Sequence, residues 1–151
     1  MSDTPRFETL DLQIGDDGAA VLTVNRPAKL NALNAQVLGE LEEAVSWLDS
    51  REAVRAVVLT GAGRGFCSGM DLKAFAAGGP PVGFDDFLRN GSAKPLIAAI
   101  EGFALAGGLE VALTCDLLVA AEGVKIGIPE ANVGLFAAGG ALLRLPRRLP
   151  Y

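Results

Sequence analysis

Three short runs of consecutive apolar residues constrain the fold of this chain more than any other feature. The runs are residues 56–59, 96–100 and 117–121, and the first is closely followed by Gly61-Ala62-Gly63. Apolar residues without alternation over four or five positions are typical of strands buried on both faces, as in a parallel sheet. Glycine-rich loops and helical segments separate these runs. Strands that alternate with helices predict an α/β fold.

Local signals predict a hairpin and a helix before the first of these runs. Residues 7–14 and 19–24 are rich in strand-forming residues, and Asp16-Asp17-Gly18 between them is typical of a hairpin turn. Apolar residues recur at helical spacing over residues 34–49, and Asn34 stands where an N-cap is expected. Two short helices are expected around residues 72–76 and 84–89, with a loop over residues 76–83.

Composition narrows the chemistry that the chain can perform. It has 151 residues, a formal net charge of −5 and no histidine. A Ser-His-Asp triad, a Cys-His dyad and a histidine-ligated zinc site are therefore excluded. An acidic chain is also a poor candidate for nucleic-acid binding, because contacts to phosphates need basic residues. Acid–base chemistry would have to come from carboxylates, Lys, Tyr or Cys with a shifted pKa.

Size and cysteine content predict one domain in a reducing compartment. A length of 151 residues suits a single domain, which we expect over residues 1–151. Cys67 and Cys115 are too few for a disulfide framework, so both are expected to be buried thiols in a cytoplasmic protein. The N-terminus lacks the features of a signal peptide, and acidic residues interrupt the most apolar stretch, residues 95–121. We therefore expect no membrane association.

Two glycine-rich loops are candidates for an oxyanion hole. Ser68 and Asp71 have capping-box spacing, which predicts that Ser68 is the N-cap of the following helix. Gly107-Gly108 precedes a helix expected over residues 109–114, and glycines let the backbone approach a ligand closely. Such loops can direct two N–H donors at one oxygen. Ordinary strand-to-helix turns remain the alternative. Neither a dinucleotide fingerprint nor a nucleophile elbow fits, because Phe66 occupies the position where each requires glycine.

Carboxylates in apolar surroundings are candidates for general acid–base catalysis. Glu110 lies in the first turn of an apolar helix, and Glu130 follows the apolar run 126–129. Burial raises the pKa of a carboxyl group, which suits proton transfer near neutral pH. The alternatives are that Glu110 interacts with its own helix dipole and that Glu130 is an exposed loop acid. Glu101 has a similar context, so context alone does not choose among the three.

Four stretches of the sequence resemble the enoyl-CoA hydratase/isomerase family, also called the crotonase superfamily. They are NRPAKLNAL at residues 25–33, GFCSGMDL at 65–72, GFALAGGLE at 102–110 and PEANVGL at 129–135. The pair Cys115-Asp116 also stands where the family often has it. The order and spacing of these stretches agree with the family across nearly the whole chain.

The resemblance implies a fold, a ligand and a set of site residues. It implies a spiral of ββα units, assembly into trimers or hexamers, and binding of acyl-CoA thioesters without a metal or redox cofactor. The oxyanion hole would be formed by the N–H groups of Ser68 and Gly107, and the catalytic pair would be Glu110 and Glu130. The residues lining the acyl-CoA pocket would be Ala28, Lys29, Leu30, Met70, Asp71 and Leu72, together with Ser68 and Gly107.

On this basis we expect an enoyl-CoA hydratase that adds water across the α,β double bond to give a 3-hydroxyacyl-CoA. The stretch LFAAGG at residues 135–140 differs from the common hydratase pattern and resembles a branch that includes carnitinyl-CoA dehydratases. The family's C-terminal helical region is not evident, so we expect the N-terminal part of a longer protein. The alternatives are carnitinyl-CoA dehydration, double-bond isomerisation, or a non-catalytic or truncated fragment of this fold.

Overall fold

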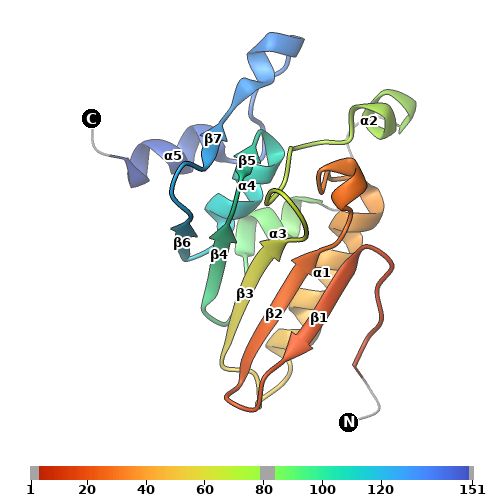
Figure 1. The fold of residues 1–151 in the computed structure, drawn as a ribbon, viewed down its shortest axis with the longest axis vertical. Coiled ribbons are helices and arrows are strands. Elements are labelled where there is room, and N and C mark those ends of the chain that lie inside the picture. Colours follow the sequence, from red (N-terminus) through yellow and green to blue (C-terminus); the bar gives the residue numbers. More distant parts are fainter. Residues whose placement is uncertain (1–3, 79–83, 150–151) are drawn as a thin grey trace.

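A five-stranded sheet forms the centre of the molecule in a computed structural model that describes residues 4–78 and 84–149 (Figure 1). The strand order is β1-β2-β3-β4-β6, in which β1 and β2 are antiparallel and all later neighbours are parallel. The strands are β1 (Leu10–Ile14), β2 (Ala19–Val24), β3 (Ala56–Gly61), β4 (Leu96–Ile100) and β6 (Leu117–Ala120). Parallel strands connected through helices confirm the predicted α/β class.

The N-terminal hairpin and the first helix form where local signals predict them. Gly18 adopts a φ of +82° in the turn between β1 and β2, which explains why glycine stands there. Helix α1 (Ala35–Asp49) begins after Asn34, whose side chain accepts a hydrogen bond from the Val37 N–H at 3.0 Å. This bond satisfies one of the free N–H groups at the start of the helix.

Helices cover one face of the sheet. Helix α1, α3 (Phe84–Asn90) and α4 (Gly107–Thr114) lie behind it in the view of Figure 1. The apolar face of α1 is buried next to β1 and β2, and most of α4 is buried among α3, α5 and β5. Burying a leucine or valine side chain stabilises a fold by about 1.5–3 kcal/mol, so this helical layer holds the core together.

The strands are not buried on both faces, and this part of the sequence-based prediction is wrong. In β3, Val57 and Leu59 are buried, whereas Val58 on the opposite face is only half-buried. Strand β6 forms an edge of the sheet, and Leu117 and Val119 are 62% and 61% exposed. The physical reason is that the helices of the described residues pack on one face, so the other face is only partly covered.

A second, two-stranded sheet lies beyond the carboxyl end of β4. It consists of β5 (Phe103–Leu105) and β7 (Lys125–Gly127), which are parallel. The turn from β4 into β5 requires glycine at position 102, where φ is +61° and an added Cβ would lie 1.9 Å from the Arg64 carbonyl oxygen. The chain continues from β7 into a short 3-10 helix, η2 (Pro129–Val133), and then into α5 (Ala141–Arg148).

The end of α2 and the start of α4 differ from the predicted boundaries. Helix α2 spans Leu72–Gly78, so the loop predicted over residues 76–83 is wrong for 76–78, and residues 79–83 lie outside the described part. Helix α4 begins at Gly107, two residues before the predicted start. Helix α5 runs through Pro146.

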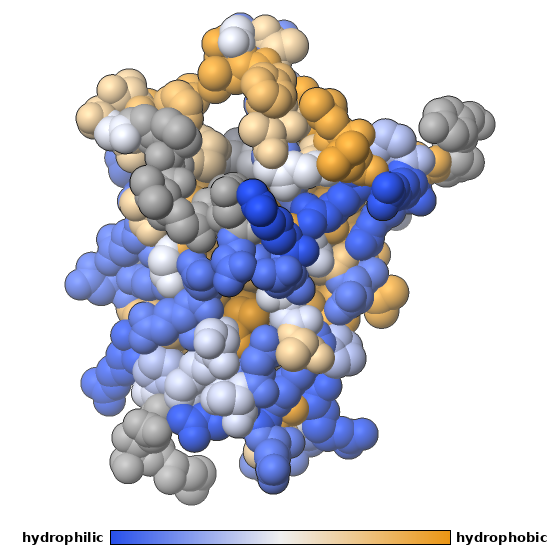
Figure 2. Space-filling model, turned by 180° about the vertical axis from the view of Figure 1, so that it is seen from behind, coloured by the Kyte–Doolittle hydropathy of each residue, from blue (hydrophilic) through white to orange (hydrophobic). Residues whose placement is uncertain are grey.

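Hydrophobic side chains gather at one end of the surface. Figure 2 shows them over η2, the segment that follows it and the start of α5, whereas the middle of that face is hydrophilic. The exposed residues of this apolar surface are Val133, Leu135, Phe136, Leu142 and Leu143. No helix in the described part of the chain is long and apolar enough to cross a membrane.

Candidate active site

Two loops from different sheets meet at the carboxyl ends of β3 and β5. The Leu105 N–H donates to the Cys67 carbonyl at 3.0 Å, and Cys67 and Ala104 form a parallel bridge. A Cβ placed on Gly69 would lie 2.7 Å from the Ala106 Cβ and 3.5 Å from the Gly107 nitrogen. The Gly69 loop therefore lies directly against the start of α4, which brings the two predicted oxyanion loops together.

Gly107 presents an unused N–H at this junction. It is the first residue of α4, and its N–H donates to no acceptor among the described residues. The first N–H groups of a helix have no partner within the helix, and its N-terminus carries a partial positive charge. This N–H is therefore free to bind an oxygen that develops negative charge, as the sequence-based hypothesis for Gly107 requires.

Ser68 lies beside the same junction, but its N–H is already used. It donates to the Leu30 carbonyl oxygen at 3.1 Å. Ser68 also does not cap the next helix, so that prediction is wrong. Asp71 directly precedes α2 and accepts a hydrogen bond from the Ala74 N–H at 3.3 Å. This hydrogen bond and the nearby Arg26 guanidinium lower the pKa of the Asp71 carboxyl.

Glu110 is a buried carboxyl in the first turn of α4, with only 5% of the residue exposed. Burial raises its pKa, and the charge of Glu130 raises it further. Its carboxylate is hydrogen-bonded to the start of α5 rather than to its own helix. The Ala141 N–H donates to Oε1 at 3.1 Å. Hydrogen bonding from Gly139 and the positive charge of Arg144 act in the opposite direction.

Glu130 lies in η2 and is half-buried. Its Oε2 is buried and has no hydrogen-bond partner among the described residues, which is unusual for a carboxylate. Since its charge acts on Glu110, the two carboxyl groups belong to one electrostatic environment. Glu101, the third candidate, is exposed in the turn between β4 and β5. The structure thus separates the exposed Glu101 from the other two carboxyl groups.

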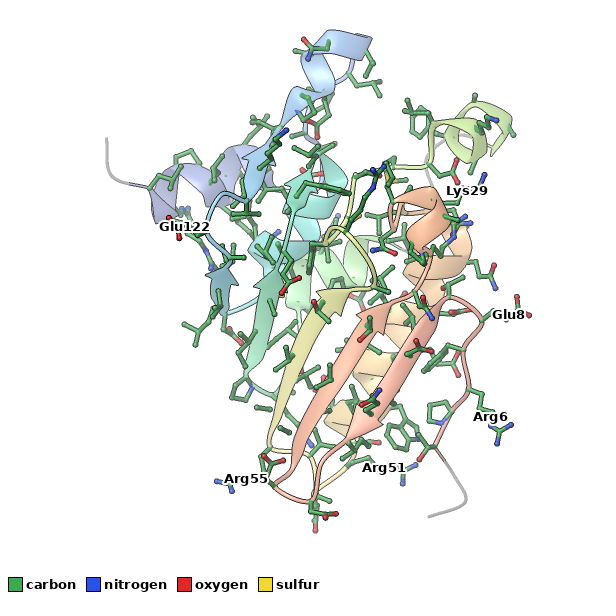
Figure 3. The ribbon with its side chains drawn as sticks, viewed as in Figure 1. Arg6, Glu8, Lys29, Arg51, Arg55 and Glu122 are labelled. Atoms are coloured by element: carbon green, nitrogen blue, oxygen red, sulfur yellow. The ribbon has the colours of Figure 1, made fainter. Side chains whose placement is uncertain are left out.

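The loops that carry the two segments expected to line an acyl-CoA pocket are hydrogen-bonded to each other. The Leu33 N–H donates to the Gly69 carbonyl at 2.8 Å, and the Asp71 N–H donates to the Leu33 carbonyl at 2.7 Å. These bonds bring the first segment, Ala28, Lys29 and Leu30, next to the second, Met70, Asp71 and Leu72. Lys29 is exposed in η1 (Pro27–Lys29), and Figure 3 shows its side chain at the outer edge of the molecule.

Asn31 organises this region, although the sequence analysis did not single it out. It is 1% exposed and has a φ of +55°. Its Oδ1 accepts from the Arg26 N–H at 2.9 Å, and its Nδ2 donates to the Ala62 and Gly65 carbonyls at 2.8 Å. The side chain of Arg26 forms an ion pair with Asp71 at 3.5 Å. The only signal for Asn31 in the sequence is an amide between apolar neighbours.

The thiols and carboxylates do not form a metal-binding group. Cys67 and Cys115 are free and buried, and burial raises the pKa of each thiol to about 12. Within residues 4–78 and 84–149, no three His, Cys, Asp or Glu side chains come together in an arrangement that could hold a metal. Both thiols are buried as predicted, and neither is suited to act as a nucleophile at neutral pH.

Comparison with known proteins identifies the class to which this fold and site belong. Residues 15–151 match the family described as Enoyl-CoA hydratase/isomerase. A crystal structure of an enoyl-CoA hydratase from Mycobacterium tuberculosis is similar, with a TM-score of 0.86 and 47% identity over 95% of this chain and 57% of that one. The chain belongs to the enoyl-CoA hydratase/isomerase family, and the α/β fold expected from the resemblance is confirmed.

Two curated relatives of the chain are named as hydratases. The chain is 41% identical to enoyl-CoA hydratase EchA19 of Mycobacterium tuberculosis over 87% of its length and 53% of that protein. It is 36% identical to mevalonyl-coenzyme A hydratase SIDH of Beauveria bassiana over 95% of its length and 57% of that protein. The chain therefore spans little more than half the length of these curated relatives.

Proposed function

We propose that this chain carries the catalytic site of an enoyl-CoA hydratase, which adds water across the α,β double bond of an enoyl thioester. The observation that carries the proposal is the pairing of the buried Glu110 carboxyl, whose pKa is raised in part by the charge of Glu130, with the half-buried Glu130, whose Oε2 is buried and has no hydrogen-bond partner among the described residues. The unused N–H of Gly107 at the start of α4 supports it, because Glu110 lies in the first turn of that helix. Relatives named as hydratases add support.

In the proposed reaction, Glu110 is the base and Glu130 the acid. The Glu110 carboxylate takes a proton from water as the water oxygen bonds to Cβ of the substrate. The electron pair of the double bond moves onto the thioester, whose oxygen the Gly107 N–H stabilises. The Ser68 N–H joins it after releasing the Leu30 carbonyl. The proton on Glu110 then passes through water to Glu130, which delivers it to the α carbon, so both carboxylates return to their starting states.

The raised pKa of Glu110 suits this role. A carboxylate in ordinary surroundings is a weak base near neutral pH, and burial makes it a stronger one. A double-bond shift needs only one carboxyl group to move a proton between two carbons. Burying a second, idle carboxyl group would cost stability, so the pair favours hydration over isomerisation.

The direct test is to mix the intact gene product with enoyl-CoA thioesters of several chain lengths. Hydration removes the conjugated absorbance and adds the mass of one water to the product. An isomerase would change the absorbance without changing the mass. A matched Glu101→Gln variant serves as a control, because Glu101 is an exposed acid outside the pair. If the product mass never increases with any thioester, the hydratase proposal is wrong.

We also propose that the protein assembles into homotrimers or hexamers in the cytoplasm. The apolar surface formed by Val133, Leu135, Phe136, Leu142 and Leu143 supports assembly, because contiguous apolar patches of soluble proteins usually mark interfaces. Light scattering during size-exclusion chromatography tests the oligomeric state, and a monomeric mass would contradict the proposal.

The two free cysteines suit a reducing compartment such as the cytoplasm. Fluorescence microscopy of the tagged gene product tests the compartment, and an organellar signal would contradict the proposal.

A further inference from the structure

Arg144 joins three separate segments around the buried Glu110. Its Nη1 donates to the Gly139 carbonyl at 3.3 Å and lies 3.5 Å from the Thr114 hydroxyl oxygen, and its Nη2 donates to the Leu88 carbonyl. Thr114 lies one turn after Glu110 on α4 and donates its hydroxyl proton to the Glu110 carbonyl at 3.1 Å. A planar guanidinium can bind all three acceptors at once, whereas a lysine ammonium has a different shape and reach.

The Gly139-Gly140 dipeptide is the link between Arg144 and the Glu110 carboxylate. A Cβ on Gly139 would lie 2.6 Å from Oε2 of Glu110, and a Cβ on Gly140 would lie 2.6 Å from Nη1 of Arg144. The carboxylate and the guanidinium therefore both pack directly against this dipeptide. No side chain would fit at either position without displacing one of them.

The backbone of residues 139–141 presents a carbonyl group to Arg144 and N–H groups to Glu110. The Gly139 carbonyl accepts a hydrogen bond from Arg144, whereas the N–H groups of Gly139 and Ala141 interact with the Glu110 carboxylate. The Gly139 carbonyl belongs to the planar peptide unit that lies between the two units whose N–H groups face Glu110, so fixing this carbonyl limits the movement of both neighbouring units. Arg144 thereby acts on Glu110 through the backbone as well as through its charge.

The charges around Glu110 come from a small number of elements. Glu130 on η2 adds a like charge, and Arg144 on α5 adds the opposite one. On α3, the charged Asp86 and Arg89 are exposed, and β5 contains no charged residue. Arg147 is an exposed residue on α5 and lines a cavity of about 320 Å³ among the ends of α3, α4 and α5. Arg147 is therefore a suitable control for Arg144.

We propose that Arg144 is a positioning residue of the reaction, which holds residues 139–141 so that their N–H groups fix the orientation of the Glu110 carboxylate. The proposal rests on the proposed function, because it matters for catalysis only if Glu110 is the base. Arg144 does not contact the reacting atoms. Its role is to hold the backbone of residues 139–141 in place and to keep a positive charge near Glu110.

The experiment compares Arg144→Gln, Arg144→Lys and the control Arg147→Gln in the intact gene product. Two quantities are measured: the pH profile of kcat/KM for hydration, and the titration of Glu110 by carbon NMR of labelled carboxyl groups. For Arg144→Gln we expect kcat to fall about 10- to 100-fold, as is typical when a catalytic group is misplaced. We also expect Glu110 to titrate at higher pH, because a positive charge that lowered its pKa is lost.

The lysine variant separates charge from geometry. In Arg144→Lys we expect the pKa of Glu110 to stay close to its value in the parent protein, because the positive charge is kept. We expect kcat still to fall, because one ammonium group cannot bind all the acceptors that the planar guanidinium binds. The Arg147→Gln control should match the parent in both measurements. A folded Arg144→Gln variant in which Glu110 titrates as in the parent overturns the proposal. If that variant does not fold, a folded Arg144→Lys protein with parental kcat overturns it instead.

The two measurements also distinguish this inference from the proposed function. If the parent protein hydrates no thioester, the hydratase proposal fails, and the Glu110 titration still tests whether Arg144 acts on that carboxyl group. If hydration occurs and the Arg144 variants behave as the control does, only the role of Arg144 is wrong.

Discussion

Replacing Gly139 with alanine adds one atom, the Cβ, next to the Glu110 carboxyl group and so tests how tightly that group is packed. The added Cβ would lie 2.6 Å from Oε2 and 2.9 Å from Cδ of Glu110, and 2.9 Å from Cδ1 of Leu88. Two of these three contacts are with the carboxyl group, so the carboxylate must rotate or the loop must shift. Overpacking of this kind costs about 1–3 kcal/mol. Either movement lengthens the 3.1 Å hydrogen bond from the Ala141 N–H.

The expected result for Gly139→Ala is a loss of about 1–3 kcal/mol in the free energy of unfolding and a kcat lower by about 10- to 100-fold. Urea unfolding and the hydration assay measure the two effects. Gly39→Ala is the matched control, because Gly39 is exposed in α1 and nothing lies within 4 Å of an added Cβ. That variant should be stabilised by about 0.5–1 kcal/mol, because alanine favours a helix. Parental stability and kcat in Gly139→Ala would refute the described packing.

Four further outcomes are expected. Gly107→Pro removes the unused N–H at the first position of α4 and also strains the turn at Ala106, where φ is +50°; in a variant shown to be folded by circular dichroism, kcat should fall about 10²–10³-fold, and a well-folded variant with parental kcat would remove Gly107 from the oxyanion hole. Because the folded-state pKa of Glu110 is raised above 4.5, the parent should lose stability as pH rises from that value through the folded pKa. Glu110→Gln should abolish this loss in thermal unfolding at a series of pH values, and an unchanged dependence would contradict the assignment. Asn31→Ala should cost about 1–3 kcal/mol in urea unfolding, because one buried and two part-buried backbone groups lose their partner; an unchanged midpoint would contradict this. Hydration should survive exhaustive EDTA treatment, since the chain has no histidine, and activity restored only by added metal would overturn the metal-free mechanism.

Features that depend on neighbouring residues in the sequence were predictable. The turn at Gly18 and the N-cap at Asn34 depend on a few adjacent residues, and the structure has both. The expectation that Glu110 lies in the first turn of an apolar helix is confirmed, and most of that helix is buried.

Features that depend on distant contacts were not predictable. Ser68 and Asp71 are both good capping residues, and Asp71 forms the cap while the Ser68 N–H bonds to Leu30. The exposure of β6 follows from its position at the sheet edge, which an apolar run does not specify. The contact between Glu110 and Ala141 joins residues 31 positions apart. Single-domain organisation and the roles of Ser68, Gly107, Glu110 and Glu130 remain predictions.

The central claim is that two carboxyl groups act together in hydration. The most direct test measures the hydration rates of Glu110→Gln, Glu130→Gln, the double variant and the control Glu101→Gln in the intact gene product. Glutamine keeps the shape of each side chain and cannot exchange the proton. Each single variant should lose about 10²–10⁴-fold, and Glu101→Gln should match the parent.

The double variant should be much less impaired than the product of the two single losses, because the two groups act in one step. If Glu110→Gln hydrates at the parental rate while Glu130→Gln is inactive, a single carboxyl group suffices and the two-carboxylate account is wrong.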